Sequence, residues 1–269
     1  MFRYLLFFCL ISYGYSRLPS GYSDFYARHK LYYLSSIFVH YLNLTGAFED
    51  CFNKYEFFGF FDLPCDMFNQ NPQNITCMGY LMASVDDEAI IIVFMPTMSD
   101  LELHQEEYFY NMTMPFPGGG TVAKFWYNGF LILWNGGLRD AFFTAKNKYP
   151  NYELWVTGGS MGGCLASNAA AYISQMGFMD KSQIKMVSFG QTRVGDAVFA
   201  ERYPNLVPYA YRIWYNNAMN EGDSYIECDE GESQNCSDQI PKNEWTWDDH
   251  KTYFNATGYI CIKGNGSKI

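Results

Sequence analysis

The sequence predicts an α/β fold in which a mostly parallel central sheet is covered by helices on both faces. A short apolar run at 152–157 is typical of a strand, and it leads directly into a glycine-rich turn. A helix-length segment of small and apolar residues follows at 161–175, and 184–189 is a second strand-length apolar run. Strands buried on both faces form such continuous apolar runs, and strand–helix–strand order indicates parallel pairing.

Further elements are expected in order along the chain. Apolar residues at helical spacing predict an N-terminal helix over 22–41. Two strand-like runs, 77–84 and 89–95, flank a short acidic turn and predict a hairpin. The segment 130–148 predicts a helix that stops before Pro150.

Length and composition predict one packed domain. The chain has 269 residues, of which 49% are hydrophobic and 19% aromatic, the opposite of a disordered composition. Because no repeat or low-complexity linker interrupts it, we expect residues 17–269 to form a single domain. The formal charge of −10 argues against binding to nucleic acid or to anionic lipid surfaces, which require a basic footprint.

The first residues have the pattern of a signal peptide, 1–16. Arg3 gives a positive start, 4–11 is a short apolar run, and Gly14 and Ser16 suit a cleavage site after Ser16. A membrane anchor is the alternative, but the apolar run is too short to span a bilayer. We therefore expect a secreted, extracellular protein without a transmembrane segment.

Asn-x-Ser/Thr sequons agree with passage through an oxidising, glycosylating compartment. Six occur in the chain, at Asn43, Asn74, Asn111, Asn235, Asn255 and Asn265. Six in one short chain fit a glycoprotein better than chance matches do.

The cysteines predict a disulfide framework. Cys164 lies among small and apolar residues of a predicted helix, so we expect a buried free thiol. Without the signal peptide, six other cysteines remain, and several connectivities are open. The local choices are Cys65–Cys77 and Cys228–Cys236, which leave Cys51–Cys261. A zinc site is the rival, but no Cys-x-x-Cys pair or His cluster supports it.

The turn at 156–163, Val-Thr-Gly-Gly-Ser-Met-Gly-Gly, matches a nucleophile elbow around Ser160. Such a turn requires glycine two residues before and two after the serine, since a Cβ there collides with neighbouring backbone. Gly158 and Gly162 fill these positions, and a strand and a helix flank the turn as the motif demands. The Met161 N–H, at the start of the helix, would be an oxyanion donor. The sequence thus predicts a serine hydrolase with the α/β-hydrolase fold.

Four segments in order resemble one family. They are Phe94-Met-Pro-Thr97, the elbow region 149–167, Phe189-Gly-Gln-Thr-Arg-Val-Gly-Asp196 and Asp249-His-Lys-Thr-Tyr-Phe254. They are similar to the oxyanion loop, elbow, following signature and C-terminal segment of the class 3 (fungal-type) triacylglycerol lipases, most of all the secreted, cysteine-rich animal branch. The resemblance implies Ser160 as nucleophile, His250 as general base, and Thr97 and the Met161 amide as oxyanion donors.

His250 has three competitors, His29, His40 and His104, but it alone follows the nucleophile. The α/β-hydrolase chain order of Ser, Asp, His requires this. A surface histidine remains the alternative.

The resemblance breaks where the family carries its catalytic Asp, in a loop between two strands. Here 207–212 runs straight into 213–217, and Ala218 stands at the expected position of the acid. Loss of this Asp costs about 10⁴ in rate in a well-studied protease but leaves some activity. Nearby acids that could substitute are Glu221, Asp223 and Asp229, and no spacing favours any of them.

Smaller departures surround the site. Gly159 replaces the family's His before the nucleophile, while Met95 and Pro96 replace Arg and Gly in the oxyanion loop. Pro96 has no N–H to tie the loop down. Thr97 keeps its own N–H and hydroxyl, so the oxyanion role is retained.

The segment 98–116 corresponds to the family's mobile lid. It contains enough apolar side chains to cover a lipid-binding cleft, namely Leu101, Leu103, Tyr108, Phe109, Tyr110, Met112, Met114 and Phe116. The triplet 118–120, Gly-Gly-Gly, would serve as a hinge. Ordinary packing of a surface helix is the alternative. A glycan on Asn111 would hinder docking at an oil interface.

The leading hypothesis is a secreted, glycosylated hydrolase of lipid or other acyl esters that requires no metal or cofactor. The rival is a catalytically inactive protein that keeps the fold and binds lipid or a partner. A third possibility is a chain that lacks one exon near residues 205–220.

Overall fold

The structure, a computed structural model, describes residues 21–40, 44–65 and 75–214, together with positions 220, 223, 253, 254, 261 and 263. For residues 37–40 and 45 it describes the backbone alone. The expected signal peptide and His250 lie outside the described residues.

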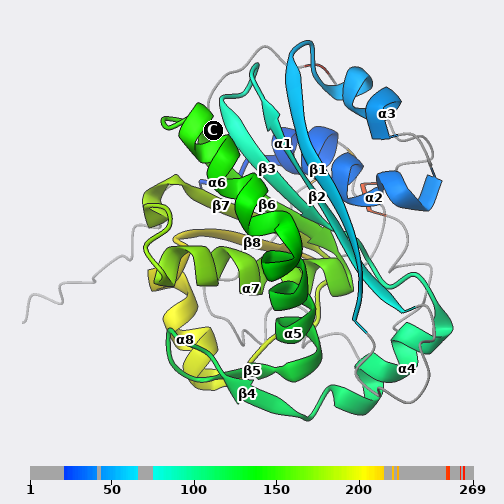
Figure 1. Cartoon of the computed structure of the whole chain (residues 1–269), viewed down its shortest axis with the longest axis vertical. Coiled ribbons are helices and arrows are strands. Elements are labelled where there is room, and N and C mark those ends of the chain that lie inside the picture. The colour runs from blue at the N-terminus through cyan, green and yellow to red at the C-terminus, as the bar shows by residue number, and fades with distance from the viewer. Residues whose placement is uncertain are drawn as a thin grey trace, which may run out of the picture.

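A six-stranded sheet forms the centre of the molecule, in the order β1-β2-β3-β6-β7-β8 (Figure 1). Its strands are β1 (Tyr55–Pro64), β2 (Thr76–Ser84), β3 (Ala89–Phe94), β6 (Glu153–Gly159), β7 (Ile184–Phe189) and β8 (Tyr209–Ile213). The first three pair antiparallel, and β3, β6, β7 and β8 pair in parallel. The predicted hairpin and the mostly parallel sheet are both confirmed.

Helices cover both faces of this sheet (Figure 1). One face carries α1 (Asp24–Tyr26), the π-helical turn η1 (Ala27–Leu31), α2 (Tyr32–His40) and α3 (Leu44–Cys51). The other carries α5 (Lys124–Leu133), the π-helical turn η2 (Trp134–Leu138), α6 (Arg139–Lys148), α7 (Met161–Gln175) and α8 (Ala197–Leu206). Shorter elements are α4 (Asp100–Phe109), β4 (Thr113–Pro115), β5 (Thr121–Ala123) and the 3₁₀ turn η3 (Lys181–Gln183).

Alternation along the strands explains the two layers. In β2, Tyr80 and Met82 belong to the apolar cluster under the N-terminal helices, whereas Leu81 belongs to the cluster under α5 and α7. Successive strand residues point to opposite faces, and here both faces are apolar. The sheet is therefore buried on both sides, as the continuous apolar runs predicted.

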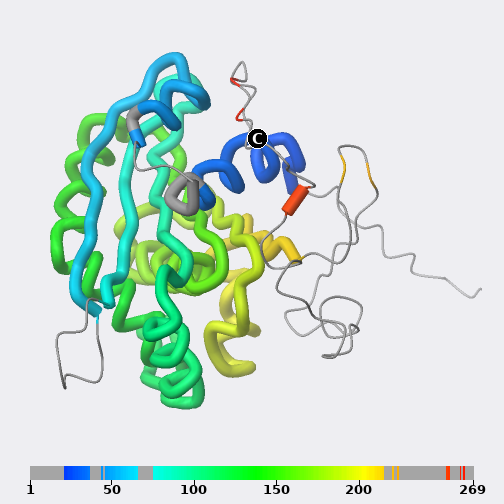
Figure 2. Tube along the Cα trace, turned by 90° about the vertical axis from the view of Figure 1, so that its right-hand side faces the viewer, coloured from blue at the N-terminus to red at the C-terminus, as the bar shows by residue number. Residues whose placement is uncertain are grey.

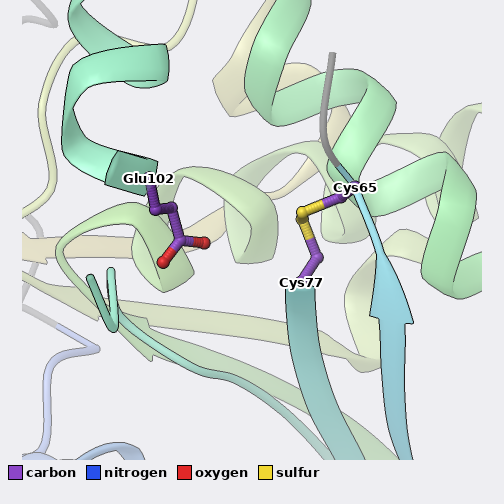
Figure 3. A group of neighbouring side chains, drawn as sticks. All are labelled: Cys65, Cys77 and Glu102. Carbon is purple, nitrogen blue, oxygen red and sulfur yellow. A yellow bond between two sulfur atoms is a disulfide. The ribbon is translucent and has the colours of Figure 1, made fainter. Parts of the chain in front are cut away.

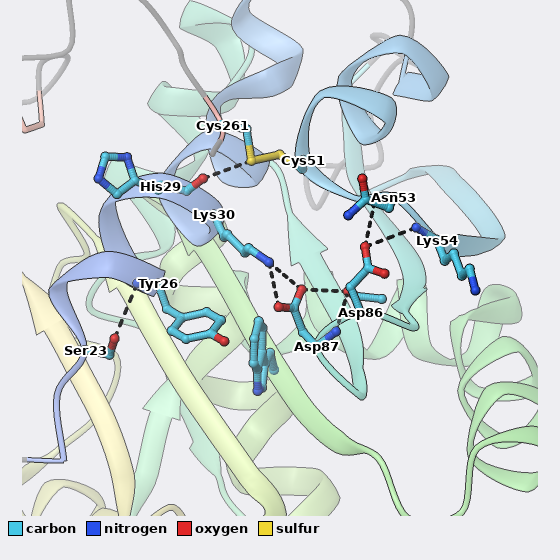
Figure 4. A network of polar contacts seen from close by, with 12 residues as sticks. Ser23, Tyr26, His29, Lys30, Cys51, Asn53, Lys54, Asp86, Asp87 and Cys261 are labelled. Carbon is cyan, nitrogen blue, oxygen red and sulfur yellow. Dashed lines mark hydrogen bonds and ion pairs between the residues drawn. A yellow bond between two sulfur atoms is a disulfide. The ribbon is translucent and has the colours of Figure 1, made fainter. Parts of the chain in front are cut away.

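The N-terminal helical layer is fixed by a buried ion pair (Figure 4). The Lys30 Nζ lies 2.6 Å from each carboxylate oxygen of Asp87, and both side chains are almost fully buried. The Ser84 hydroxyl donates a third hydrogen bond to Asp87, at 2.6 Å. Because Asp87 lies in the turn between β2 and β3, this pair connects η1 directly to the hairpin.

The helix predicted over 130–148 begins earlier, at Lys124, and continues through α5, η2 and α6. It is interrupted at Gly137, where φ is 129°. The helices over 24–40 and 161–175 and the strands over 153–159 and 184–189 confirm the other predicted elements. No helix among the described residues is long and apolar enough to cross a bilayer.

Two of the expected disulfides are present, Cys51–Cys261 and Cys65–Cys77. The first joins the end of α3 to Cys261, and the few described residues after 250 lie beside the N-terminal helices (Figure 2). Cys164 is a buried free thiol, as predicted. The expected Cys228–Cys236 pair lies outside the described residues.

Candidate active site

Ser160 occupies the sharp turn between β6 and α7. Its φ of 51° and ψ of −122° are strained for a residue with a side chain, which is the backbone signature of an elbow. The Ser160 amide donates to the carbonyl of Phe189 at the end of β7, at 2.8 Å. The turn is thus held against the carboxyl edge of the sheet.

The flanking glycines are sterically required. A Cβ on Gly158 would lie 2.4 Å from the carbonyl carbon of Gly162, and one on Gly162 would lie 2.3 Å from the Phe94 oxygen. Gly159 differs, because the nearest atom to a Cβ there is the Phe189 oxygen at 3.9 Å. A Cβ at position 159 would therefore make only an ordinary van der Waals contact beside Ser160.

The start of α7 has the backbone geometry that the predicted oxyanion donor requires. The Ser160 carbonyl accepts from the amides of Gly163 and Cys164, at 3.0 and 3.3 Å, so the helix begins immediately after the nucleophile. The Met161 amide is in the first turn, where helix geometry provides no acceptor within the helix. Such amides are directed at an incoming anion.

Thr97 reaches the same edge of the sheet from the neighbouring strand. β3 and β6 are parallel, with Phe94 opposite Gly158, so Thr97 and Ser160 both follow the carboxyl ends of adjacent strands. Ligand sites of α/β sheets form at this edge. The structure thus brings three of the four predicted site residues, Ser160, Met161 and Thr97, to one end of the sheet.

The Thr97 hydroxyl donates a short hydrogen bond to Oε1 of Glu106 in α4. Glu106 Oε2 also lies 3.5 Å from Nε1 of Trp126, which donates to it from α5. Burial raises the pKa of Glu106 to about 7. Sequence reasoning missed this carboxylate, because nothing in the composition of α4 marks one of its several acids as the partner of Thr97.

A second acid, Glu102, lies one turn earlier in α4 and is buried. Its Oε2 accepts from the Met98 amide at 2.7 Å, and its own amide donates to the Ser99 hydroxyl at 3.2 Å. Burial raises the pKa of Glu102 to about 7 as well. The pattern Ser99-x-x-Glu102 is a capping-box signal that could have located the start of this helix.

Some apolar residues of the lid segment 98–116 are buried and others are exposed. Phe109 and Phe116 are buried in the main apolar cluster, which fits ordinary packing. Five neighbouring apolar side chains are exposed, namely Met98, Leu101, Tyr108, Tyr110 and Met112. A Cβ on Gly120, where φ is 76°, would lie 2.5 Å from the Phe199 amide. The glycine triplet therefore makes a close contact with α8, a physical role that the predicted hinge did not include.

The segment after His250 is anchored next to the elbow. The rings of Tyr253 and Phe254 each lie 6.0 Å from the Phe189 ring, centroid to centroid. The Tyr253 amide donates to the Tyr32 hydroxyl at 3.2 Å. His250 itself lies outside the described residues.

The expected position of the triad acid follows β8. This strand ends at Ile213, whose carbonyl accepts from the Gly190 amide at 3.0 Å, so it ends at the same edge as the elbow. Asp223 accepts from the Asn220 amide at 2.7 Å and is exposed. Ala218, Glu221 and Asp229 lie outside the described residues.

The fold is that of an α/β hydrolase, with Ser160 in an elbow between β6 and α7. Residues 94–219 match the family model described as lipase (class 3). Over these residues the chain is similar to the class 3 lipase family.

Two relatives illustrate the similarity. The chain is 28% identical over 249 residues to Lipase ZK262.3 of Caenorhabditis elegans, covering 72% of this chain and 68% of that protein. It is 31% identical over 94 residues to Secreted mono- and diacylglycerol lipase 1 of Fusarium solani, covering 34% of this chain and 27% of that protein.

Solved structures agree on the fold. A fungal lipase–inhibitor complex, described as a model for interfacial activation, superposes with a TM-score of 0.69 at 19% identity, covering 88% of this chain and 95% of that one. The triacylglyceride lipase of Rhizomucor miehei gives a TM-score of 0.63 at 18% identity, covering 88% and 95%.

Proposed function

We propose that this protein hydrolyses acyl esters of lipids, with Ser160 as the nucleophile. The observation that carries the proposal is the strained backbone of Ser160, in an elbow between β6 and α7 at the edge that Thr97 also reaches. The match of residues 94–219 to the class 3 lipase model supports this reaction class. Neither the mechanism nor the sequence calls for a metal or cofactor.

The proposed chemistry is acyl transfer in two steps. The Ser160 oxygen attacks the ester carbonyl carbon while His250 takes its proton, and His250 then protonates the departing alcohol. Water attacks the resulting acyl-enzyme and loses its proton to His250, which returns that proton to the Ser160 oxygen as the fatty acid leaves. The amides of Thr97 and Met161 would stabilise the oxyanion at each tetrahedral stage.

The anchoring of Tyr253 supports His250 as the base. Tyr253 packs against Phe189, whose carbonyl accepts from the Ser160 amide. The chain three residues after His250 is therefore held close to the elbow, which supports the proposed role.

The absence of the family's Asp from its expected position predicts a low rate of ester hydrolysis. Without an acid to orient and stabilise the imidazolium, we expect rates reduced by about 10⁴ from a complete triad, with the oxyanion site retained. The second candidate function, an inactive protein that binds lipid or a partner, is favoured by the same substitution of Ala218 for the acid.

One experiment separates the two functions. The folded protein is treated with a fluorophosphonate probe beside the matched variant Ser160→Ala. Labelling of the wild-type chain that Ser160→Ala abolishes supports the enzyme, whereas equal labelling of both, or none, contradicts it. Sequencing the transcript across residues 205–220 tests the missing-exon alternative, because an in-frame insertion with an Asp would restore the triad.

Secretion and glycosylation are part of the proposal. The disulfides Cys51–Cys261 and Cys65–Cys77 fit an oxidising compartment. The Asn111 sequon lies on an exposed turn after α4, where an oligosaccharide has room. Expression in a secreting eukaryotic host, followed by glycosidase treatment of wild-type and Asn111→Gln protein, tests this. The variant should lack one glycan, and the medium should contain both proteins.

A further inference from the structure

The lid helix α4 buries polar side chains and turns apolar ones toward solvent. Glu102 projects from α4 toward the Cys65–Cys77 disulfide (Figure 3), and only 1% of its surface is exposed. Leu101 and Tyr108 are seven residues apart, on another side of the helix, and are 38% and 60% exposed. Exposed apolar surface of this kind marks a place where another molecule binds.

The turn after α4 continues this apolar surface on both sides of a glycosylation sequon. Tyr110 and Met112 are each 41% exposed, and Asn111 between them is exposed as well. The Met112 amide donates to the Phe109 carbonyl at 3.0 Å, which closes the turn. We call the three exposed side chains around Asn111, those of Tyr108, Tyr110 and Met112, the lid patch.

The charge next to the lid patch does not suit a membrane surface. Helices that lie on anionic lipid combine an apolar side with lysine and arginine on the polar side. The segment 98–116 contains no lysine or arginine, and it contains four acids, Asp100, Glu102, Glu106 and Glu107. An anionic lipid surface therefore repels the segment that carries the lid patch.

We propose that an N-linked oligosaccharide on Asn111 covers the lid patch, so that this enzyme acts on esters dispersed in water as single molecules and not on esters at an oil surface. The inference rests on the proposed function and names how its substrate is presented. In the glycosyl transfer, the Asn111 amide nitrogen forms a bond to C1 of the first sugar of a lipid-pyrophosphate-linked oligosaccharide. The bond from C1 to the pyrophosphate oxygen breaks, the carrier leaves, and the amide loses one proton.

A covalently attached oligosaccharide suits this place for three reasons. Asn111 lies in an exposed turn, so a bulky and hydrated group has room there. The attachment makes its contact with neighbouring side chains intramolecular, which raises the effective concentration to the millimolar range. The apolar faces of sugar rings lie well against aromatic rings such as those of Tyr108 and Tyr110, while the hydroxyl groups stay in water. An oil droplet would have to displace this layer to reach the lid patch.

Two variants remove the oligosaccharide through different residues. Asn111→Gln removes the attachment site, and Thr113→Val removes the hydroxyl that the sequon requires. Thr113→Ser is the matched control, because it changes the same exposed position and keeps the sequon. Each full chain is produced in a secreting eukaryotic host, and peptide mass spectrometry measures the occupancy of Asn111.

Flotation with triolein droplets coated with phosphatidylcholine measures docking independently of activity. Wild type and Thr113→Ser should stay in the aqueous phase, whereas Asn111→Gln and Thr113→Val should bind the droplets at least about tenfold more. Tenfold requires burial of only roughly 60 Å² of apolar surface. Glycosidase treatment of the folded wild-type protein should give the same increase, which keeps the test valid if a variant folds poorly.

Hydrolysis tests how the substrate is presented. All four proteins should hydrolyse p-nitrophenyl butyrate, kept below its solubility limit, at rates within about twofold of one another. The two variants without the oligosaccharide should hydrolyse emulsified triolein at least about tenfold faster than wild type. Absence of hydrolysis by all four proteins would contradict the proposed function, and flotation would still decide whether the oligosaccharide covers the lid patch.

Three results would overturn the proposal. One is an unmodified Asn111 in the secreted wild-type protein, and another is equal flotation of wild type and Asn111→Gln. The third is equal flotation of Thr113→Ser and Thr113→Val, because the side chain at 113 and not the oligosaccharide would then control docking.

Discussion

The Thr97 hydroxyl donates to the Glu106 carboxylate, and this contact joins the candidate oxyanion loop to the lid helix α4. Glu106 also receives Nε1 of Trp126, so the acceptor is fixed between α4 and α5. Because the Thr97 hydroxyl donates to this carboxylate, the Thr97 side chain is kept in one rotamer. We infer that Glu106 is a positioning residue for the loop, and that the Thr97 amide is the donor left for the oxyanion.

Substitution of Glu106 tests this positioning role. Glu106→Ala removes the acceptor of Thr97 and should lower kcat by up to about 10²-fold, approaching the loss of an oxyanion donor, with little change in KM. Glu106→Gln retains an acceptor oxygen and should keep most of the activity. Steady-state hydrolysis of a p-nitrophenyl ester measures both, and an unchanged kcat in Glu106→Ala would rule the role out.

Two acids of α4, the buried Glu102 and the partly buried Glu106, make its packing pH-dependent. Burial raises the pKa values of Glu102 and Glu106 from 4.5 to about 7. Their protonated forms favour the buried helix, so this stability is full below about pH 4.5 and is lost as pH rises through 7. Hydrogen exchange in 100–109, corrected for intrinsic rates, should therefore show more opening at pH 8 than at pH 5.

A double variant serves as the control for that pH dependence. Glu102→Gln with Glu106→Gln removes both titrating groups, so the exchange of α4 amides should become nearly independent of pH. Persistence of the full dependence in the double variant would assign it to other groups.

Two adjacent glycines of the elbow should respond oppositely to the same change. Gly158→Ala places a Cβ 2.4 Å from backbone of Gly162 and should disrupt the elbow, abolishing Ser160-dependent labelling. Gly159→Ala meets nothing closer than 3.9 Å and should leave labelling within about twofold of wild type. Probe labelling with melting temperatures measures both, and equal sensitivity of the two sites would contradict the elbow geometry.

The elements that the sequence predicted correctly are those determined by a local pattern of residues. The helix at 161–175 and the strand at 184–189 follow from apolar runs and a glycine turn whose steric demands are local. β1 was not predicted, because a bulge between Phe57 and Gly59 interrupts the strand and its apolar and polar residues do not alternate regularly. The roles of Glu102 and Glu106 were also missed, since burial of one acid among several depends on tertiary packing.

Lys30 is another residue whose role depends on tertiary packing, because in the sequence it has the appearance of an ordinary surface lysine of a helix. Its Nζ lies 2.6 Å from both oxygens of Asp87, and its side chain is 1% exposed. Removing one partner leaves the other charge buried and unpaired, which costs about 3–5 kcal/mol. Lys30→Met should lower the free energy of unfolding by that amount in denaturant titrations at neutral pH.

The double variant Lys30→Met, Asp87→Leu separates two contributions to the loss of stability, the lost ion pair and the cost of burying an unpaired charge. Replacing both members of a buried pair by apolar residues is often neutral or stabilising, so much of the lost stability should return. The exposed pair Arg139–Asp140 is the matched control, and Arg139→Met should change stability by less than about 1 kcal/mol. If Lys30→Met were as mild as Arg139→Met, the ion pair could not be what holds η1 against the hairpin.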